Sequence, residues 1–167
     1  DALARTGLTS IDQAQTWIAS NVIAHTDRIA PTPVEFGSEM EAAFALDSVP
    51  AIVAALEASS TESALAAAAT LRHRSPLMLH VVLEQLRRAR TMGLADDLRM
   101  ERNLVRHCFH LRCGTASETV EGIRALAVDK DHRPRWNPAR IEDVGGDEVA
   151  AFFVSPWPAH AHPLRDL

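Results

Sequence analysis

The stretch that decides the fold is residues 117–144, SETVEGIRALAVDKDHRPRWNPARIEDV. It opens as an amphipathic helix, for which either Ser117 or a capping box between Thr115 and Glu118 supplies the N-terminal cap. The apolar residues that recur at helical spacing are Val120, Ile123 and Ala127. Because Pro134 cannot continue a helix, the sequence predicts a charged turn after this segment.

The remainder of the stretch predicts a second, shorter helix beyond the turn. Trp136 offers a large apolar side chain that can hold the turn against a neighbouring element. Asn137 is a suitable N-cap, and Pro138 suits the first position of a helix. We therefore expect a short helix to begin at Asn137-Pro138.

The rest of the chain also has the spacing and the capping residues of helices. Helices are expected from Ser10 to about Ala24, from Ser38, from Asp47 or Ser48, over residues 61–71, from Ser75 to Gly93, over residues 94–111 and from Asp147. The side chains expected to face the interior are Met40, Phe44, Ile52, Val53, Leu56, Leu79, Val82, Leu83, Leu86, Leu94, Leu98, Leu104, Val105, Cys108, Val149, Phe152 and Phe153. No segment alternates with period two for long enough to predict a strand, so we expect an all-α fold of about eight helices.

The composition is that of a globular protein. The 167 residues are 47% hydrophobic and 23% charged, and the formal net charge is −5, which argues against a general attraction to nucleic acid. No apolar run is long enough to predict a membrane span, and the first residues lack the pattern of a signal peptide. Two cysteines without a disulfide framework predict a cytoplasmic location. Because the chain opens with Asp1 in a helical pattern, we expect a fragment, a processed product or one segment of a longer protein.

Three runs in the opening stretch resemble the C-terminal signature of the 3-hydroxyisobutyryl-CoA hydrolases, which belong to the enoyl-CoA hydratase/isomerase (crotonase) superfamily. The runs are EGIRA at 121–125, DKD at 129–131 and RPRWNP at 133–138. Glu118 and Thr119 stand where that family usually has Asp and Phe. The similarity continues upstream through the segments 47–56, 74–88 and 98–104, so order and spacing agree over roughly residues 40–153.

The resemblance implies a fold and a division of the chain. The fold would be the irregular multi-helix C-terminal region of a crotonase-like protein, lacking the β-α turn-stack core of that superfamily. Residues 1–37 would be an N-terminal helix and connector that match the family poorly. Residues 38–154 would form the crotonase-like helical domain, and residues 155–167 an irregular or mobile tail.

The resemblance also implies a reaction, the hydrolysis of a short hydroxyacyl-CoA thioester in valine breakdown. That chemistry needs an oxyanion hole and a carboxylate acid or base. In crotonases the hole is built from Gly-rich turns in the N-terminal half, whereas the only adjacent glycines here are Gly145-Gly146, between short helices. We therefore expect no catalytic residue in this chain and no cofactor, with coenzyme A entering as part of the substrate.

The chain would then cover the active site of a catalytic N-terminal half or companion chain, and supply packing or oligomer contacts in a homo-oligomer or a heteromeric assembly. Two alternatives stay open. The complete protein could be an enoyl-CoA hydratase or isomerase of the same superfamily. The chain could also be a non-catalytic helical interaction subunit derived from a crotonase.

The candidate binding residues for coenzyme A lie in the charged turn. Lys130, Arg133 and Arg135 could hold its phosphates, because cationic groups of this kind bind phosphate well. Arg140 could join them. The alternative is a solvated turn whose bases pair locally with Asp129 and Asp131. In crotonases the C-terminal helices lie near the adenosine end of coenzyme A, which keeps the binding hypothesis open.

Glu101 is predicted to be a structural buried acid. It lies in the middle of an apolar stripe on the helix over residues 94–111, where an acid is not expected. The favoured interpretation is a buried carboxylate paired with an arginine of a neighbouring helix, Arg74 or Arg124. The alternative is an acid of raised pKa in a functional site.

Three other groups of residues are candidates for binding. His107, Cys108, His110 and Cys113 could approach a metal ion, but no fourth ligand or paired-cysteine motif accompanies them, so no metal site is expected. Arg87, Arg88 and Arg90 lack interleaved aromatic residues, so no nucleic-acid partner is expected. His160 and His162 fall in the predicted tail. No membrane partner is expected for the chain.

Overall fold

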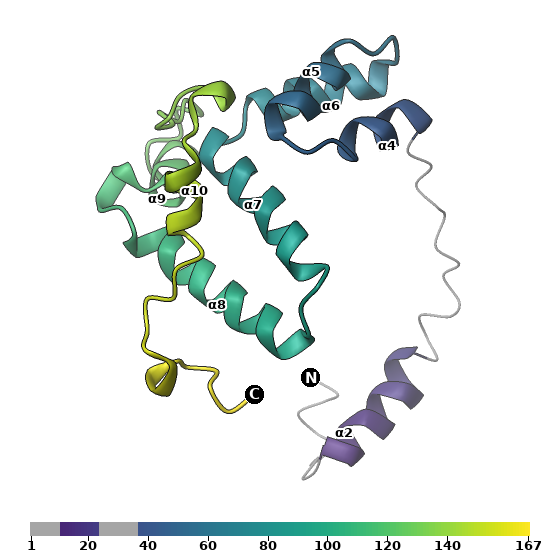
Figure 1. The fold of residues 1–167 in the computed structure, drawn as a ribbon, viewed down its shortest axis with the longest axis vertical. Helices are drawn as coiled ribbons and strands as arrows, with labels where there is room; N and C mark the ends of the chain where they lie inside the picture. The colour runs from purple at the N-terminus through teal and green to yellow at the C-terminus, as the bar shows by residue number, and fades with distance from the viewer. Residues whose placement is uncertain (1–10, 24–36) are drawn as a thin grey trace. The chain divides into compact units, whose positions relative to one another are not determined.

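The computed structural model describes residues 11–23 and 37–167 (Figure 1). The α-helices are α2 (Ile11–Ile18), α4 (Ser38–Phe44), α5 (Val49–Glu57), α6 (Glu62–Arg72), α7 (Pro76–Ala89), α8 (Leu94–His110), α9 (Glu118–Ile123) and α10 (Gly146–Ala151). Shorter 3-10 or π turns are η1 (Ala19–Ile23), η2 (Gly114–Ala116), η3 (Arg124–Val128), η4 (Ile141–Asp143) and η5 (Ala159–Ala161). No strand occurs in these residues, which confirms the predicted all-α class for the described part of the chain.

The chain divides into two compact units, Asp1–Glu35 and Phe36–Leu167. The described part of the first unit is α2 with η1, in agreement with the helix predicted from Ser10 to about Ala24. The predicted connector lies almost entirely outside the described residues. Among the helices that are described, none is long and apolar enough to cross a membrane. The predicted domain boundaries at residues 37 and 154 stay predictions.

Serine side chains begin three helices at the predicted residues. The hydroxyls of Ser48, Ser75 and Ser117 accept hydrogen bonds from the backbone N–H of the third following residue, at 3.2, 3.2 and 3.4 Å. Each bond satisfies an N–H group that has no partner within its helix. Local chemistry therefore sets where α5, α7 and α9 begin.

Two predicted helix caps are wrong. Gly37, and not a side chain of the following capping box, occupies the N-cap of α4. Helix α10 begins at Gly146, ahead of the predicted cap Asp147, because the Glu148 carboxylate accepts a hydrogen bond from the backbone N–H of Gly145 at 3.0 Å. A glutamate at the third helical position can satisfy this N–H group without a capping hydroxyl.

One part of the core lies between α4, α5 and α6. Ile52 and Leu56 are buried there as predicted, packed against small residues of the neighbouring helices, Ala43, Ala64 and Ala68. The prediction for Phe44 is wrong, since its side chain is exposed. The neighbouring residue Ala43 is buried instead, at 4% exposed, and belongs to the same cluster.

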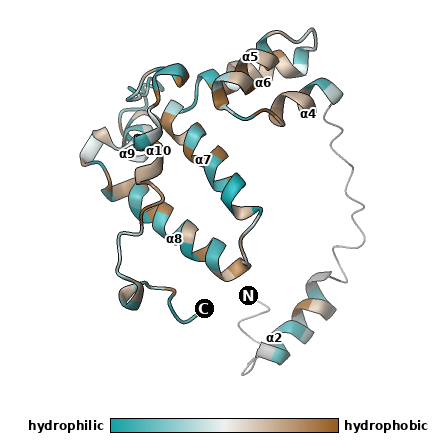
Figure 2. Ribbon diagram, in the orientation of Figure 1, coloured by the Kyte–Doolittle hydropathy of each residue, from teal (hydrophilic) through white to brown (hydrophobic). Residues whose placement is uncertain are grey.

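A second part of the core joins α7, α8 and α10. Here the predicted helix faces are right only in part, because Leu104 and Phe152 are buried as predicted but other residues are not. The buried residues are Leu77, Val81, Met100, Leu104 and Phe152. Of the residues predicted to face inward, Val82, Leu86, Leu94, Leu98 and Val105 are exposed. Apolar and polar residues alternate along both helices (Figure 2), and apolar side chains lie on more than one side of each. Helical spacing alone therefore does not select the side that α10 covers.

The predicted helix at Asn137-Pro138 does not form. The Asn137–Pro138 peptide bond is cis, and the next helical turn is η4, beginning at Ile141. The Asn137 N–H donates to the Glu118 carboxylate at 2.9 Å, and the Asn137 carbonyl accepts from the Arg112 guanidinium at 2.5 Å. Contacts with distant side chains thus hold this segment in a non-helical bend.

The tail over residues 155–167 is irregular, as predicted, but it is attached to α8. Arg99 donates through Nε to the carbonyl of Leu164 at 3.1 Å. The His162 ring, predicted to be part of a mobile tail, is buried and its Nε2 lies 3.1 Å from Oδ1 of Asn103. The mobile interpretation of this histidine is therefore wrong.

Candidate functional site

Helix α9 buries its acids and exposes its apolar residues. Glu118 and Glu121 are only 5% and 3% exposed, whereas Ile123 is 46% exposed. Residues three apart lie on the same side of a helix, so the two glutamates face the interior together. Ile123 and Ala127, which recur at helical spacing with Val120, are both exposed. Buried carboxylates require partners, and the surrounding turn supplies them.

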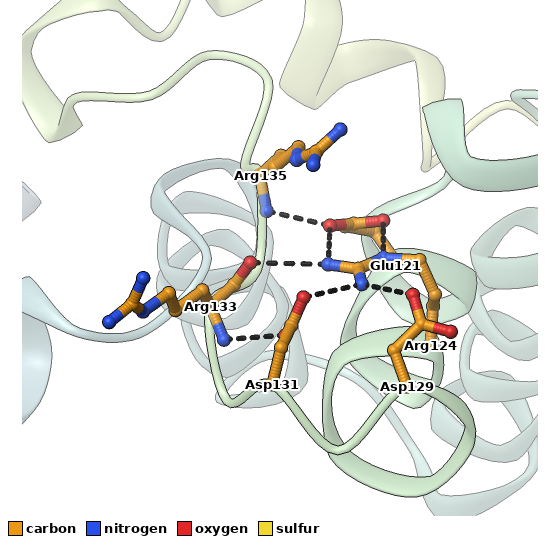
Figure 3. A network of polar contacts seen from close by, with 6 residues as sticks. All are labelled: Glu121, Arg124, Asp129, Asp131, Arg133 and Arg135. Atoms are coloured by element: carbon orange, nitrogen blue, oxygen red, sulfur yellow. Dashed lines mark hydrogen bonds and ion pairs between the residues drawn. The ribbon is translucent and has the colours of Figure 1, made fainter.

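Arg124 is the centre of a polar network in the charged turn (Figure 3). Its guanidinium binds both carboxylate oxygens of Glu121, at 2.8 and 2.9 Å. The same group donates to Asp129 at 2.6 Å, to Asp131 at 2.8 Å and to the carbonyl oxygen of Arg133 at 3.1 Å. A guanidinium has enough donors in a fixed plane to make all of these contacts. The network therefore ties the end of α9 to residues 129–133.

The network lowers the pKa of Glu121 and of Asp131. The Arg124 guanidinium and the backbone N–H of Arg135, which lies 2.7 Å from Oε1, lower the pKa of Glu121 to about 2. Arg124 and the Arg133 N–H also lower the pKa of Asp131. The acids in turn raise the pKa of Arg124. A carboxylate that stays ionised at neutral pH cannot donate a proton, so Glu121 is no general acid.

Glu118 joins three segments of the chain. Its carboxylate accepts a hydrogen bond from the Ser75 hydroxyl at 2.5 Å and from the Asn137 N–H at 2.9 Å. Ser75 also caps α7, so the acid links α9, the start of α7 and the bend before η4. Both oxygens are used in these contacts, which indicates a structural role for Glu118.

The turn contains two residues in the left-handed region of backbone space. Lys130 and His132 each have φ of 55°. This conformation is uncommon for residues other than glycine, asparagine and aspartate, and it persists only where surrounding contacts enforce it. The contacts from Arg124 to Asp129 and Asp131 enforce it here. The turn is therefore a rigid element.

A cleft of about 440 Å³ lies beside this turn. Its walls combine apolar and basic groups, among them Ile123, Leu126, Trp136, His73, Arg74 and His132. The Trp136 indole closes one side, with its N–H 3.4 Å from the His73 carbonyl. A Cβ added at Gly122 would lie 3.3 Å from the Trp136 ring, so glycine lets the ring approach α9. Such walls suit a ligand that has both an apolar and an anionic part.

The three predicted coenzyme A ligands all lie on the exposed side of the turn. Lys130, Arg133 and Arg135 are exposed, and Figure 3 shows the guanidinium groups of the two arginines pointing away from the network in different directions. Their backbones support the turn, because the Arg133 carbonyl and the Arg135 N–H contact the network. The exposed Arg140 side chain lies 3.7 Å from Glu142. The structure thus leaves these cationic groups accessible without gathering the two arginines at one point.

The prediction of a buried acid at Glu101 is wrong. Glu101 is exposed and accepts a hydrogen bond from Gln85 at 3.2 Å. The stripe in which it lies faces outward, because Met100 and Leu104 face the core instead. Arg124, one of its proposed partners, binds Glu121. The three-residue spacing of Glu118, Glu121 and Arg124 on one helix face was the available sign of a buried network.

The other candidate groups have local partners. The His107 ring is buried with Nε2 2.7 Å from the Val154 carbonyl, and no set of three or more His, Cys, Asp or Glu in the described residues is arranged to hold a metal ion. Arg87 donates to the Asp47 carbonyl. Arg88 binds Glu84 at 2.8 Å, and its guanidinium also lies over the Phe153 ring.

Comparison with known proteins assigns a class to this arrangement. The family described as enoyl-CoA hydratase/isomerase matches residues 1–153. A crystal structure of a carnitinyl-CoA dehydratase from Mycobacterium thermoresistibile superimposes with a TM-score of 0.61 at 32% identity, over 87% of this chain and 43% of that chain. An enoyl-CoA hydratase from Rhodobacter sphaeroides 2.4.1 gives the same TM-score at 26% identity, over 89% of this chain and 44% of the other. The chain belongs to the enoyl-CoA hydratase/isomerase family.

Among the curated relatives, the names refer to 3-hydroxyisobutyryl-CoA hydrolases or to proteins like them. The 3-hydroxyisobutyryl-CoA hydrolase-like protein 5 of Arabidopsis thaliana is 33% identical over 114 residues, which are 66% of this chain and 29% of that protein. The mitochondrial 3-hydroxyisobutyryl-CoA hydrolase of Xenopus tropicalis is 32% identical over 112 residues, 67% of this chain and 28% of that protein. The matched part therefore spans less than a third of these relatives.

Proposed function

We propose that this chain is the C-terminal helical portion of an acyl-CoA thioester hydrolase resembling 3-hydroxyisobutyryl-CoA hydrolase. It covers an active site that another part of the complete protein, or a companion chain, provides. The substrate is a short hydroxyacyl-CoA of the kind released in valine breakdown, and coenzyme A enters only as part of it.

The observation that carries this proposal concerns Glu118 and Glu121, the acids of the segment that resembles the hydrolases: both are engaged in structural contacts. Glu118 and Glu121 spend their oxygens on Ser75, Arg124 and backbone N–H groups. They therefore build a rigid turn beside a cleft and leave the acid or base to a different part of the protein. The hydrolase names of the curated relatives support the reaction, and their greater length supports a separate catalytic part.

The test compares residues 1–167 alone with the complete protein in an assay for free coenzyme A released from 3-hydroxyisobutyryl-CoA. We expect release by the complete protein and none by the isolated chain. Turnover by the isolated chain would contradict the claim that catalysis lies elsewhere. Absence of release by the complete protein would contradict the hydrolase assignment.

A second function is favoured by the solved structures, a dehydratase and a hydratase. In that case the complete protein would add water to, or remove water from, an acyl chain that stays attached to coenzyme A. Analysis of the products separates the two proposals. A hydrolase yields a free acid, whereas a hydratase yields a 3-hydroxyacyl-CoA.

Coenzyme A binding by Lys130, Arg133 and Arg135 is part of the proposal. Their exposure leaves the cationic groups free to reach phosphate oxygens, and the rigid turn would hold Lys130 in place for this.

The cytoplasmic location also stays a prediction. Xenopus tropicalis and Gallus gallus relatives are named as mitochondrial, so fractionation of the cells that make the protein is the relevant measurement.

A further inference from the structure

The tail over residues 155–167 contains a histidine whose two ring nitrogens have opposite hydrogen-bonding roles. The backbone N–H of Leu164 donates to Nδ1 of His162 at 3.0 Å, so this nitrogen is an acceptor and carries no hydrogen. On the other side of the ring, Nε2 lies 3.1 Å from Oδ1 of Asn103 on α8. A neutral imidazole has one acceptor and one donor nitrogen, so Nε2 donates to Asn103. These contacts therefore require the uncharged ring in a single tautomer.

The ring of His162 is also shielded from water. His162 is only 7% exposed, and its ring meets the indole of Trp157 edge to face, with 5.4 Å between the ring centroids. The guanidinium of Arg102 on α8 lies 5.0 Å from the centroid of the same indole. A charge on the imidazole would lose most of its hydration in these surroundings, which is unfavourable unless an opposite charge is close.

The charged groups around the ring do not supply that opposite charge. Arg99 of α8 and Arg165 of the tail line the same cavity as His162, which has a volume of about 430 Å³. The neighbouring acids are engaged with these arginines, since Asp96 lies 2.8 Å from Arg99 and Asp166 lies 3.5 Å from Arg165. Among the residues that the structure describes, no acid forms an ion pair with His162. A proton on the ring would therefore add a like charge beside two guanidinium groups.

We propose that His162 makes the tail a pH-sensitive clasp on α8, closed when the ring is neutral and open when it is protonated. A proton on Nδ1 would face the N–H of Leu164, so two donors would oppose each other and neither would be satisfied. Histidine is the side chain that ordinarily changes charge between about pH 5 and 8. The clasp is closed at the upper end of this range and opens as the pH falls, because its contacts exist only in the unprotonated state.

Opening at His162 also weakens the second attachment of the tail. Leu164 gives its N–H to His162 and its carbonyl oxygen to Nε of Arg99, so the two attachments share one residue. Arg99 also donates to the carbonyl oxygens of Arg165 and Leu167. Displacement of Leu164 therefore moves the atoms that Arg99 binds. The family match covers residues 1–153, ahead of the tail, and the clasp does not depend on which reaction the complete protein performs.

Hydrogen exchange in the complete protein, isolated with any polypeptide that accompanies the chain, tests the clasp. Mass spectrometry follows backbone exchange from about pH 8 to about pH 5, and protection is expressed relative to an unstructured chain at the same pH. We expect the protection of residues 161–167 to fall about tenfold or more across this range. Helix α6 is the internal control, and its protection should change less than about twofold. Unchanged protection of the tail overturns the proposal.

Two histidine variants separate His162 from other groups that titrate. His162→Asn keeps a side-chain acceptor for the N–H of Leu164 but takes up no proton in this range, so the fall in protection should disappear. His160→Asn is the matched control at an exposed position of the same tail, and it should keep the fall. A fall of the parent's size in His162→Asn, or no fall in His160→Asn, overturns the assignment to His162.

A direct measurement on the ring decides the case in which His162→Asn leaves the tail detached at every pH. NMR of isotope-labelled histidine distinguishes the two neutral tautomers from the protonated ring, and the signal of His162 is the one missing from the His162→Asn spectrum. We expect the Nε2–H tautomer in the closed tail and protonation of the ring in the pH interval where protection falls. An Nδ1–H tautomer in the closed tail, or detachment while the ring stays neutral, overturns the proposal.

Discussion

Arg124 is the residue on which the turn after α9 depends, because one guanidinium holds three carboxylates and a carbonyl oxygen. Lysine could replace its charge but not its planar set of donors. At the scale of single residues, the ionisation of Glu121 and of Asp131 is therefore linked to folding. The turn they stabilise also carries the proposed ligands of coenzyme A.

The pH dependence of stability reports on Glu121. Its pKa is lowered from 4.5 to about 2 in the folded chain, so its contribution to stability is complete above pH 4.5. The contribution is lost as the pH falls from 4.5 towards 2, where the folded carboxylate takes up its proton. We expect Glu121→Gln to be less stable at pH 7 and to show a shallower fall in this range. Urea unfolding at a series of pH values measures both, and parallel curves for the two proteins would contradict the assignment.

Lys130 permits a test of strain and of binding at one position. Lys130→Gly relieves the left-handed conformation and should raise the free energy of unfolding by about 0.5–1 kcal/mol. It also removes an ammonium group, so the KM of the complete enzyme for its acyl-CoA should rise about threefold or more with kcat unchanged. Lys130→Arg keeps the charge and should restore KM. A rise in KM for both variants would argue against a phosphate contact.

At the scale of elements, the burial of two leucines on α7 identifies the side of this helix that packs inward. Leu77 is fully buried between α7 and α8, whereas Leu86 is 58% exposed. We expect Leu77→Ala to lower the free energy of unfolding of the isolated chain by about 2–5 kcal/mol, through lost burial and the cavity that remains. Leu86→Ala should change it by less than about 0.5 kcal/mol. Chemical denaturation of both variants measures the difference, and similar losses would mean that the helix face is assigned wrongly.

Three helix beginnings were predicted correctly, whereas the inward faces of the helices were predicted only in part. Ser48, Ser75 and Ser117 cap their own helices, a local interaction that sequence spacing reveals. The inward face depends on what packs against a helix, and α10 joins the α7–α8 core from far along the chain. The prediction of a buried acid at Glu101 failed for the same reason. The apolar stripe in which Glu101 lies exists, but it faces outward.

The candidate site likewise contains contacts that the sequence predicts and contacts that it does not. Glu121 and Arg124 are three residues apart, so their pairing follows from helical geometry. The contact from Ser75 to Glu118 joins residues 43 positions apart, and nothing in local sequence predicts it. The bend at Asn137 is held by the same acid, and it replaces the helix that the local sequence favours. Tertiary contacts therefore decide the parts of the site that periodicity cannot.

At the scale of the whole molecule, the exposed apolar surface predicts how the isolated chain behaves. Residues 1–167 alone should self-associate at rising concentration, because Leu86, Leu94 and Val105 lack a covering partner in the described structure. The double variant Leu86→Glu, Val105→Glu should be substantially less associated, since charge opposes contact between these surfaces. Static light scattering measures both. A monodisperse, monomeric parent chain would instead favour the free, non-catalytic helical subunit.

The attachment of the tail to α8 bears on how the protein can vary. Arg99 grips the carbonyl oxygens of Leu164, Arg165 and Leu167, which every amino acid possesses. The side chains at these three positions can therefore change without removing the hydrogen bonds that attach the tail to Arg99. Arg99 therefore anchors the last residues of the tail through their backbone, whereas His162 is held separately by its contact with Asn103.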